Sequence, residues 1–169
     1  QEFLAKAQNH LEKEFRVIHL GAGFDTRFIR LGQVIPSNVT LVEVDIVTTQ
    51  RLKLETLKKA GISTDHVKYV SIDFSSQELE DVLVEQEVWN KNITTLFMWE
   101  GVSMYIPQFQ VEKILTMVGQ SAKGSEIYFD VLFDFFSEDA AIPMSNAASL
   151  NLKLVNNKGE PFLFGIKEQ

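Results

Sequence analysis

One segment near the start of the chain constrains the fold more than any other. A short, mostly apolar run at residues 16–20 ends abruptly in Gly21-Ala22-Gly23, and Asp25 follows. The pattern predicts a buried strand, a tight turn and the start of a helix, because glycine lets the backbone turn sharply and lets a ligand approach the main chain. The segment therefore indicates the first βα unit of a nucleotide-binding fold.

The next apolar run carries two acids near its end. Glu43 stands 20 residues after Gly23, which is where a nucleotide-binding βαβ unit carries its ribose-binding carboxylate. Asp45 lies just past the strand expected at 39–44, where ligands bind in open sheets. Only one of the two should reach the ribose. A simpler alternative is that both acids favour the start of the next helix.

The glycine turn also bears on the identity of the cofactor. A dinucleotide fingerprint needs a third glycine at position 26, where this chain has Thr26. Asp25 would repel a pyrophosphate and attract an ammonium group. We therefore expect S-adenosylmethionine, which carries an ammonium, a sulfonium and a ribose diol but no phosphate. An NAD(P)-binding Rossmann oxidoreductase is the alternative, and a plain βα turn without a ligand is the structural one.

Composition narrows the class of partner. The 169 residues suit one domain, and a net charge of −7 without a basic stripe makes nucleic acid an unexpected partner. Cysteine is absent, and no two histidines have ligand spacing, so we predict neither a disulfide nor a metal site. No apolar run reaches 18 residues and no signal peptide opens the sequence. We expect a cytoplasmic protein that does not enter a membrane.

Apolar runs alternate with helical patterns along the chain. The alternation predicts a parallel sheet with helices on both faces, within a single domain over residues 1–169. A helix is expected at 2–14, and a lid or substrate insertion at 134–156. Ser75 and Glu78 are spaced as a capping box for the third of the later helices. The expected strands are 16–20, 39–44, 67–72, 94–99 and 126–133, and the helices between them follow Thr26, cover 47–60, follow Ser75 and follow Pro107.

Four motifs in this order resemble the leucine carboxyl methyltransferase family over roughly residues 15–166. The bacterial branch, provisionally described as S-adenosylmethionine-dependent O-methyltransferases, is the most similar. The resemblance implies a Rossmann-like class I methyltransferase fold. The motifs are Leu20-Gly21-Ala22-Gly23-Phe24-Asp25-Thr26-Arg27, Glu43-Val44-Asp45, Val70-Ser71-Ile72-Asp73-Phe74 and Trp99-Glu100-Gly101-Val102-Ser103-Met104-Tyr105.

The resemblance also implies roles for matched residues at two parts of the cofactor. Gly21 and Gly23 would line its methionine part, and Glu100 would lie near the same end. Asp45 would take the ribose hydroxyls. A functional role for Glu100 agrees with its place at the end of a buried strand, where an unpaired acid is costly.

At the adenine, the resemblance implies that Asp73 meets the exocyclic amine and that Phe74 packs on the ring. The residues themselves leave a competing reading for Asp73, since an acid between a strand and a helix is also a common N-terminal cap. The family carries an arginine upstream of the glycine turn and further strands at its end. We expect this chain to be shortened at both ends relative to that pattern.

The expected reaction is methyl transfer to a carboxylate or hydroxyl of a small molecule, or to a protein C-terminus as in the eukaryotic members. Displacement at a methyl group mainly requires alignment of the reacting atoms. No catalytic residue or general base is predicted, which favours an acceptor such as a carboxylate that is already ionised at neutral pH. The remaining alternative is a shortened module that binds the cofactor without turnover.

Overall fold

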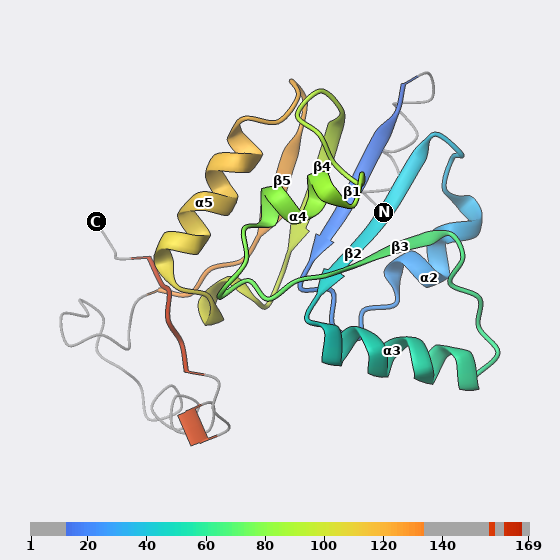
Figure 1. Ribbon diagram of the computed structural model, residues 1–169, viewed down its shortest axis with the longest axis horizontal. Coiled ribbons are helices and arrows are strands. Elements are labelled where there is room, and N and C mark those ends of the chain that lie inside the picture. The colour runs from blue at the N-terminus through green and yellow to red at the C-terminus, as the bar shows by residue number, and fades with distance from the viewer. Residues whose placement is uncertain (1–12, 134–155, 158–160, 167–169) are drawn as a thin grey trace.

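The computed structural model describes residues 13–133, 156–157 and 161–166, and shows a layered α/β arrangement (Figure 1). The five strands are all parallel and lie in the order β3-β2-β1-β4-β5. The elements are β1 (Phe15–Leu20), α2 (Arg27–Leu31), η1 (Gly32–Val34), β2 (Val39–Asp45), α3 (Val47–Lys59), β3 (Val67–Ser71), α4 (Leu79–Glu85), β4 (Thr94–Trp99), η2 (Ser103–Tyr105), α5 (Gln108–Gly119) and β5 (Glu126–Phe129).

The central strand fixes where a ligand can bind. All six residues of β1 are buried, as expected for a parallel strand that is covered on both faces. Leu20 at its end is paired in register with Val44 of β2 on one side and with Trp99 of β4 on the other. The chain leaves β1 toward β2 and later returns to β1's other side with β4. The carboxyl ends of β1 and β4 therefore form the switch point at which open α/β sheets bind ligands.

The two faces of the sheet are packed differently. On one face, strand residues such as Ile18, Val42 and Phe97 pack with Leu83 of α4 and Ile114 of α5 in one large apolar cluster. Both helices lie over the same face in Figure 1. On the opposite face, a smaller cluster forms around Phe28 of α2, with strand residues that include Val17, Leu41 and Leu96.

Most of the expected elements are confirmed, and one strand is shorter than expected. The sequence predicts a strand over 126–133, but β5 ends at Phe129. The reason lies in Asp130, whose side chain Oδ1 accepts a hydrogen bond from the Gly101 backbone N at 2.8 Å, while its backbone O accepts one from Ser103 Oγ at 2.6 Å. The residue thereby braces the loop after β4 instead of extending the sheet.

The predicted capping box is wrong. α4 begins at Leu79 with Glu78 in the cap position, and no side chain caps it. Residues 73–77 form a turn instead, because the carboxylate of Asp73 accepts hydrogen bonds from the Ser75 backbone N and from Ser76 Oγ. The helix expected at 2–14 and nearly all of the lid expected at 134–156 lie outside the described residues. Within the described ranges, no helix has the length and apolar character needed to span a bilayer.

Candidate functional site

The glycine turn after β1 is held against the end of β2. The backbone N–H groups of Gly21 and Ala22 both donate to the Val44 carbonyl, at 2.8 and 3.1 Å. Gly21 and Gly23 have φ angles of 67° and 49°, in the left-handed region that favours glycine. A Cβ on Gly21 would collide with the Val102 side chain, whereas one on Gly23 would find no atom closer than 4.0 Å. The turn is therefore packed at its first glycine and open at its second.

Asp45 joins the glycine turn to the next strand end. Its Oδ2 accepts a hydrogen bond from the Gly23 backbone N at 2.5 Å, and its Oδ1 accepts one from the Ile46 backbone N at 2.8 Å. The residue is partly exposed. An ionised carboxylate has about four lone-pair sites, so both oxygens can still accept hydrogen bonds from a ligand.

A cluster of three charged side chains spans the switch point. Arg27 donates from Nε to Asp25 Oδ2 at 2.7 Å and pairs through Nη2 with Glu100 Oε2 at 2.6 Å. The Arg27 backbone N also donates to Asp25 Oδ1 at 2.6 Å. Burial raises the pKa of Asp25, but these hydrogen bonds outweigh it and hold the pKa below its ordinary value. Burial likewise lowers the pKa of Arg27, and its bonds to both carboxylates raise it above the ordinary value.

Glu43 and His19 lie beneath this edge rather than on it. The Glu43 side chain is 2% exposed and pairs with Lys53 Nζ of α3 at 2.5 Å. Burial raises the pKa of Glu43 against the opposing effect of Lys53. His19 in β1 is also buried. Burial, followed by the charge of Arg27, lowers the pKa of His19 to about 4, so its ring is neutral at physiological pH.

Asp73 and Phe74 follow β3, beyond β2 and away from the switch point. Asp73 is exposed, and its hydrogen bonds from Ser75 and Ser76 lower its pKa. Phe74 is buried in the cluster under α4 and α5. The predicted site residues therefore fall into two groups. Gly21, Gly23, Asp25, Asp45 and Glu100 meet around the glycine turn, whereas Asp73 and Phe74 stand two strands away and Glu43 is covered by α3.

The comparison with protein families places this arrangement. The model of the family described as leucine carboxyl methyltransferase matches residues 2–119, which is more than half of the chain. The chain belongs to the leucine carboxyl methyltransferase family. A curated relative from Streptomyces coelicolor, provisionally named an S-adenosyl-L-methionine-dependent methyltransferase, is 28% identical over 113 residues. The match covers 66% of this chain and 39% of that relative, so the chain spans about two fifths of its length.

Solved structures support the same fold for this member of the family. LepI in complex with S-adenosylmethionine aligns over 99% of this chain and 38% of its own, with a TM-score of 0.56 and 12% identity. PKMT2 from Rickettsia typhi in complex with S-adenosylhomocysteine aligns over 84% and 28%, with a TM-score of 0.51 and 16% identity. At these identities the likeness establishes the fold alone, which is the Rossmann-like fold of S-adenosylmethionine-dependent methyltransferases.

Sequence reasoning missed Arg27 as a member of the site in this methyltransferase-family chain. The residue ends the first motif, and its signal is the acid two positions earlier together with an acid directly after β4. Sequence spacing alone does not show that β1 and β4 are neighbours, which is what brings Arg27 to Glu100. Arg16, the other arginine near the glycine turn in sequence, pairs with Glu14 at the amino end of β1.

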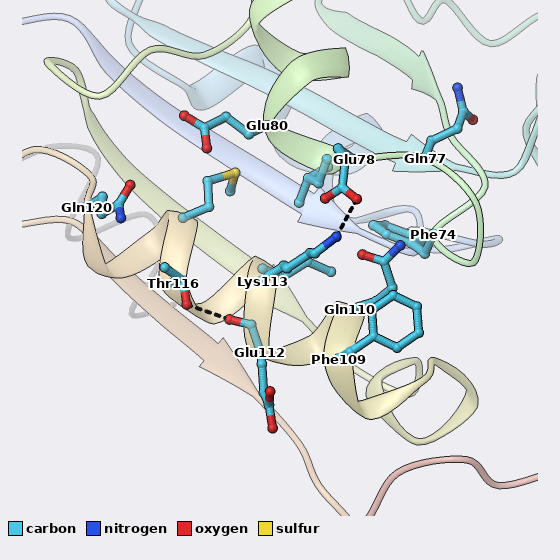
Figure 2. A pocket seen from close by; sticks show the side chains of 13 residues that line it. Phe74, Gln77, Glu78, Glu80, Phe109, Gln110, Glu112, Lys113, Thr116 and Gln120 are labelled. Atoms are coloured by element: carbon cyan, nitrogen blue, oxygen red, sulfur yellow. Dashed lines mark hydrogen bonds and ion pairs between the residues drawn. The ribbon is translucent and has the colours of Figure 1, made fainter.

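A groove of about 600 Å³ lies between α4 and α5, apart from the glycine turn (Figure 2). Phe74 is the one predicted site residue in its lining. The Lys113–Glu78 ion pair, at 2.6 Å, crosses it, and Lys113 Nζ also lies 5.6 Å from the centre of the Phe109 ring. The groove therefore holds a surface ion pair already matched in charge, whereas the acids at the switch point have charge and lone pairs to spare.

Proposed function

We propose that this chain is the cofactor-binding part of an S-adenosylmethionine-dependent O-methyltransferase that acts on a carboxylate or hydroxyl of a small molecule. One observation carries the proposal above the others. Asp45 is bonded to the second glycine of the turn, so that the ribose-binding acid and the backbone approach to the methionine part form one rigid unit. Family membership and the fold support the same cofactor.

The residues around the turn suit the polar groups of S-adenosylmethionine. The free lone pairs of Asp45 suit the two ribose hydroxyls, and the carboxylates of Asp25 and Glu100 suit an ammonium group. The same acids oppose a pyrophosphate, which argues against a dinucleotide. Asp73 and Phe74 stay proposed contacts of the adenine. Glu43 is left out of the proposed contact set, because its carboxylate is buried against Lys53.

When bound, S-adenosylmethionine supplies an electrophilic methyl group on its sulfonium. The chain's own contribution is to hold that end of the cofactor in one orientation, which is the main requirement of a direct displacement. Neither histidine in the described residues offers a base at this edge. His19 is buried, and His66 precedes β3 at the opposite end of the sheet, where its Nε2 lies 3.0 Å from the Phe28 carbonyl. These positions favour an acceptor that is ionised without help, such as a carboxylate.

Calorimetric titration with S-adenosylhomocysteine tests the proposal. The parent chain should bind it, and Asp45→Asn should weaken binding at least about 10-fold, as expected for losing a charged hydrogen-bond acceptor. Asp81→Asn makes the same change of charge at an exposed position in the first turn of α4 and should leave binding unchanged. NADH is titrated in parallel.

The outcomes separate the competing functions. Binding of NADH without S-adenosylhomocysteine would contradict the proposal in favour of an oxidoreductase. Binding of S-adenosylhomocysteine that Asp45→Asn does not change would remove Asp45 from the site. If the cofactor binds as expected, the chain is next mixed with S-adenosylmethionine labelled in its methyl group and with pools of carboxylic acids and phenols. Transfer to an oxygen of either pool supports the enzyme, and transfer to neither supports a binding module.

A further inference from the structure

We propose that Arg27 binds the carboxylate of the cofactor's amino-acid end, and that the Asp25–Arg27–Glu100 cluster is the closed form of that subsite. The inference rests on the proposed function and extends it to a residue that neither the motif analysis nor the comparisons assign. In the closed form, the guanidinium occupies both carboxylates. In the bound form, it turns part of its donor set toward the ligand's carboxylate and leaves Glu100 to the ligand's ammonium.

The position of Arg27 supports this role. The side chain extends from the start of α2 to Glu100, the residue that follows β4, and so crosses the switch point between the two central strand ends. Leu20 and Trp99 are register partners, which puts Gly21 and Glu100 at adjacent strand ends. A ligand whose amino-acid end lies over the glycine turn must therefore meet Arg27 and Glu100 together.

The donor count leaves room for a ligand. A guanidinium has five N–H donors. Arg27 uses Nε toward Asp25 and Nη2 toward Glu100, and Nη1 has no partner among the residues that the structure describes. Its side chain is 32% exposed, so a small carboxylate can reach it. Arginine is suited to this contact because its planar fork matches a carboxylate in two parallel hydrogen bonds.

Charge balance favours a ligand that carries both signs. The cluster has two carboxylates and one guanidinium, and His19 beneath it stays neutral, so the local charge is negative. An α-amino acid group replaces the internal pair by two new pairs, its ammonium with Glu100 and its carboxylate with Arg27. No charge is left unpaired in this exchange. An amine alone would leave Arg27 competing with it for the same acids.

Other cations in the described part of the chain are less suited to this carboxylate. Lys53 is buried against Glu43, and Arg16 lies at the amino end of β1. Arg30 shares α2 with Arg27, but it is exposed, and its Nε donates to Thr26 Oγ1 at 3.1 Å. Arg30 is therefore a matched control, because it has the same charge, the same helix and no contact with the acids.

The experiment compares three ligands by calorimetric titration. S-adenosylhomocysteine has both charged groups, its decarboxylated analogue keeps the amine alone, and 5′-methylthioadenosine has neither. The parent chain should bind S-adenosylhomocysteine about 10- to 100-fold more tightly than the decarboxylated analogue, which is the range for a hydrogen bond between charged groups. Arg27→Gln should abolish this preference and leave affinity for 5′-methylthioadenosine unchanged, and Arg30→Gln should change neither.

Each outcome decides a different point. Equal binding of S-adenosylhomocysteine and its decarboxylated analogue by the parent chain overturns the inference without any variant, as does a preference that persists in Arg27→Gln. If Arg27→Gln does not fold, the three ligands on the parent chain and on Arg27→Lys still decide, because lysine keeps the charge and should keep part of the preference. Failure of the parent chain to bind any of the three overturns the proposed function, and this inference with it.

Discussion

Two groups of ionic side chains lie close together in this fold and differ in every respect except residue type. The Glu43–Lys53 pair lies between β2 and α3, with side chains 2% and 3% exposed, and its charges balance one to one. The Asp25–Arg27–Glu100 cluster lies at the carboxyl ends of β1 and β4, with side chains 24%, 32% and 50% exposed, and has one carboxylate in excess. The first is closed to any ligand, and the second is accessible.

The difference shows that exposure and charge balance, more than residue identity, separate a structural ion pair from a binding site. A buried pair has lost its hydration, so each charge depends wholly on the other. A partly exposed cluster keeps water as an alternative partner, so it can exchange one ion pair for another at small cost. The predictions below test this contrast by removing a single charge from each environment.

The largest effect is expected where a charge would be left buried and alone. Lys53→Met should lower the free energy of unfolding by about 3–5 kcal/mol at pH 7, because Glu43 remains in the interior without a partner. Denaturant titration followed by circular dichroism measures the change. The double variant Glu43→Met/Lys53→Met should recover most of the loss, since a matched apolar pair carries no unpaired charge.

The pH dependence of Lys53→Met provides a second check. Burial already raises the pKa of Glu43 in the intact pair, and loss of Lys53 removes the effect that opposes it. A carboxyl whose folded pKa lies above its unfolded value of about 4.3 stabilises the fold below that value, and the benefit is lost as pH rises through the folded pKa. The deficit of the variant should therefore shrink as pH falls from 8 to 5. A deficit independent of pH would contradict the assignment to Glu43.

A smaller effect is expected at the exposed cluster. Asp25→Asn should cost about 1 kcal/mol at pH 7, because Arg27 keeps Glu100 and water as partners. The folded pKa of Asp25 lies below its unfolded value, so its contribution is present above about pH 3.9 and is lost as pH falls through the folded pKa. The difference in unfolding free energy between the parent and Asp25→Asn should therefore narrow toward pH 3. A loss as large as that of Lys53→Met would contradict the contrast.

Much of the fold could be predicted from local patterns. The apolar run at 94–99 matches β4 at both ends, and the helix expected at 47–60 corresponds to α3, Val47–Lys59. Both depend on residue periodicity and on a stop signal such as Gly61. The end of β5 could not be predicted in this way. It depends on Asp130 bonding the loop after β4, which is a contact between residues 29 positions apart.

The site was only partly predictable for the same reason. Spacing pointed to Glu43 as much as to Asp45, and both side chains lie on one face of β2 because they are two residues apart. α3 begins at Val47 and brings Lys53 over Glu43, which leaves Asp45 beyond the cover. Arg27 became visible only once β1 and β4 were neighbours. Which acid is covered and which cation is shared depends on tertiary packing, which sequence spacing does not encode.

The smallest effect is expected at Asp73, whose environment is almost entirely water. Its carboxylate accepts bonds from the Ser75 backbone N at 2.9 Å and from Ser76 Oγ at 3.0 Å, and holds the turn before α4. Asp73→Ala should lower the free energy of unfolding by about 0.5 kcal/mol, and Asp73→Asn, which keeps an acceptor in the same place, should cost less. Titration with S-adenosylhomocysteine then separates the two roles of this residue. If Asp73→Ala weakens binding and Asp73→Asn does not, the acceptor contacts the adenine amine as well as the turn. If both variants bind like the parent chain, Asp73 serves the turn alone, and an exposed acid on the site's rim is no more a ligand contact than the buried Glu43.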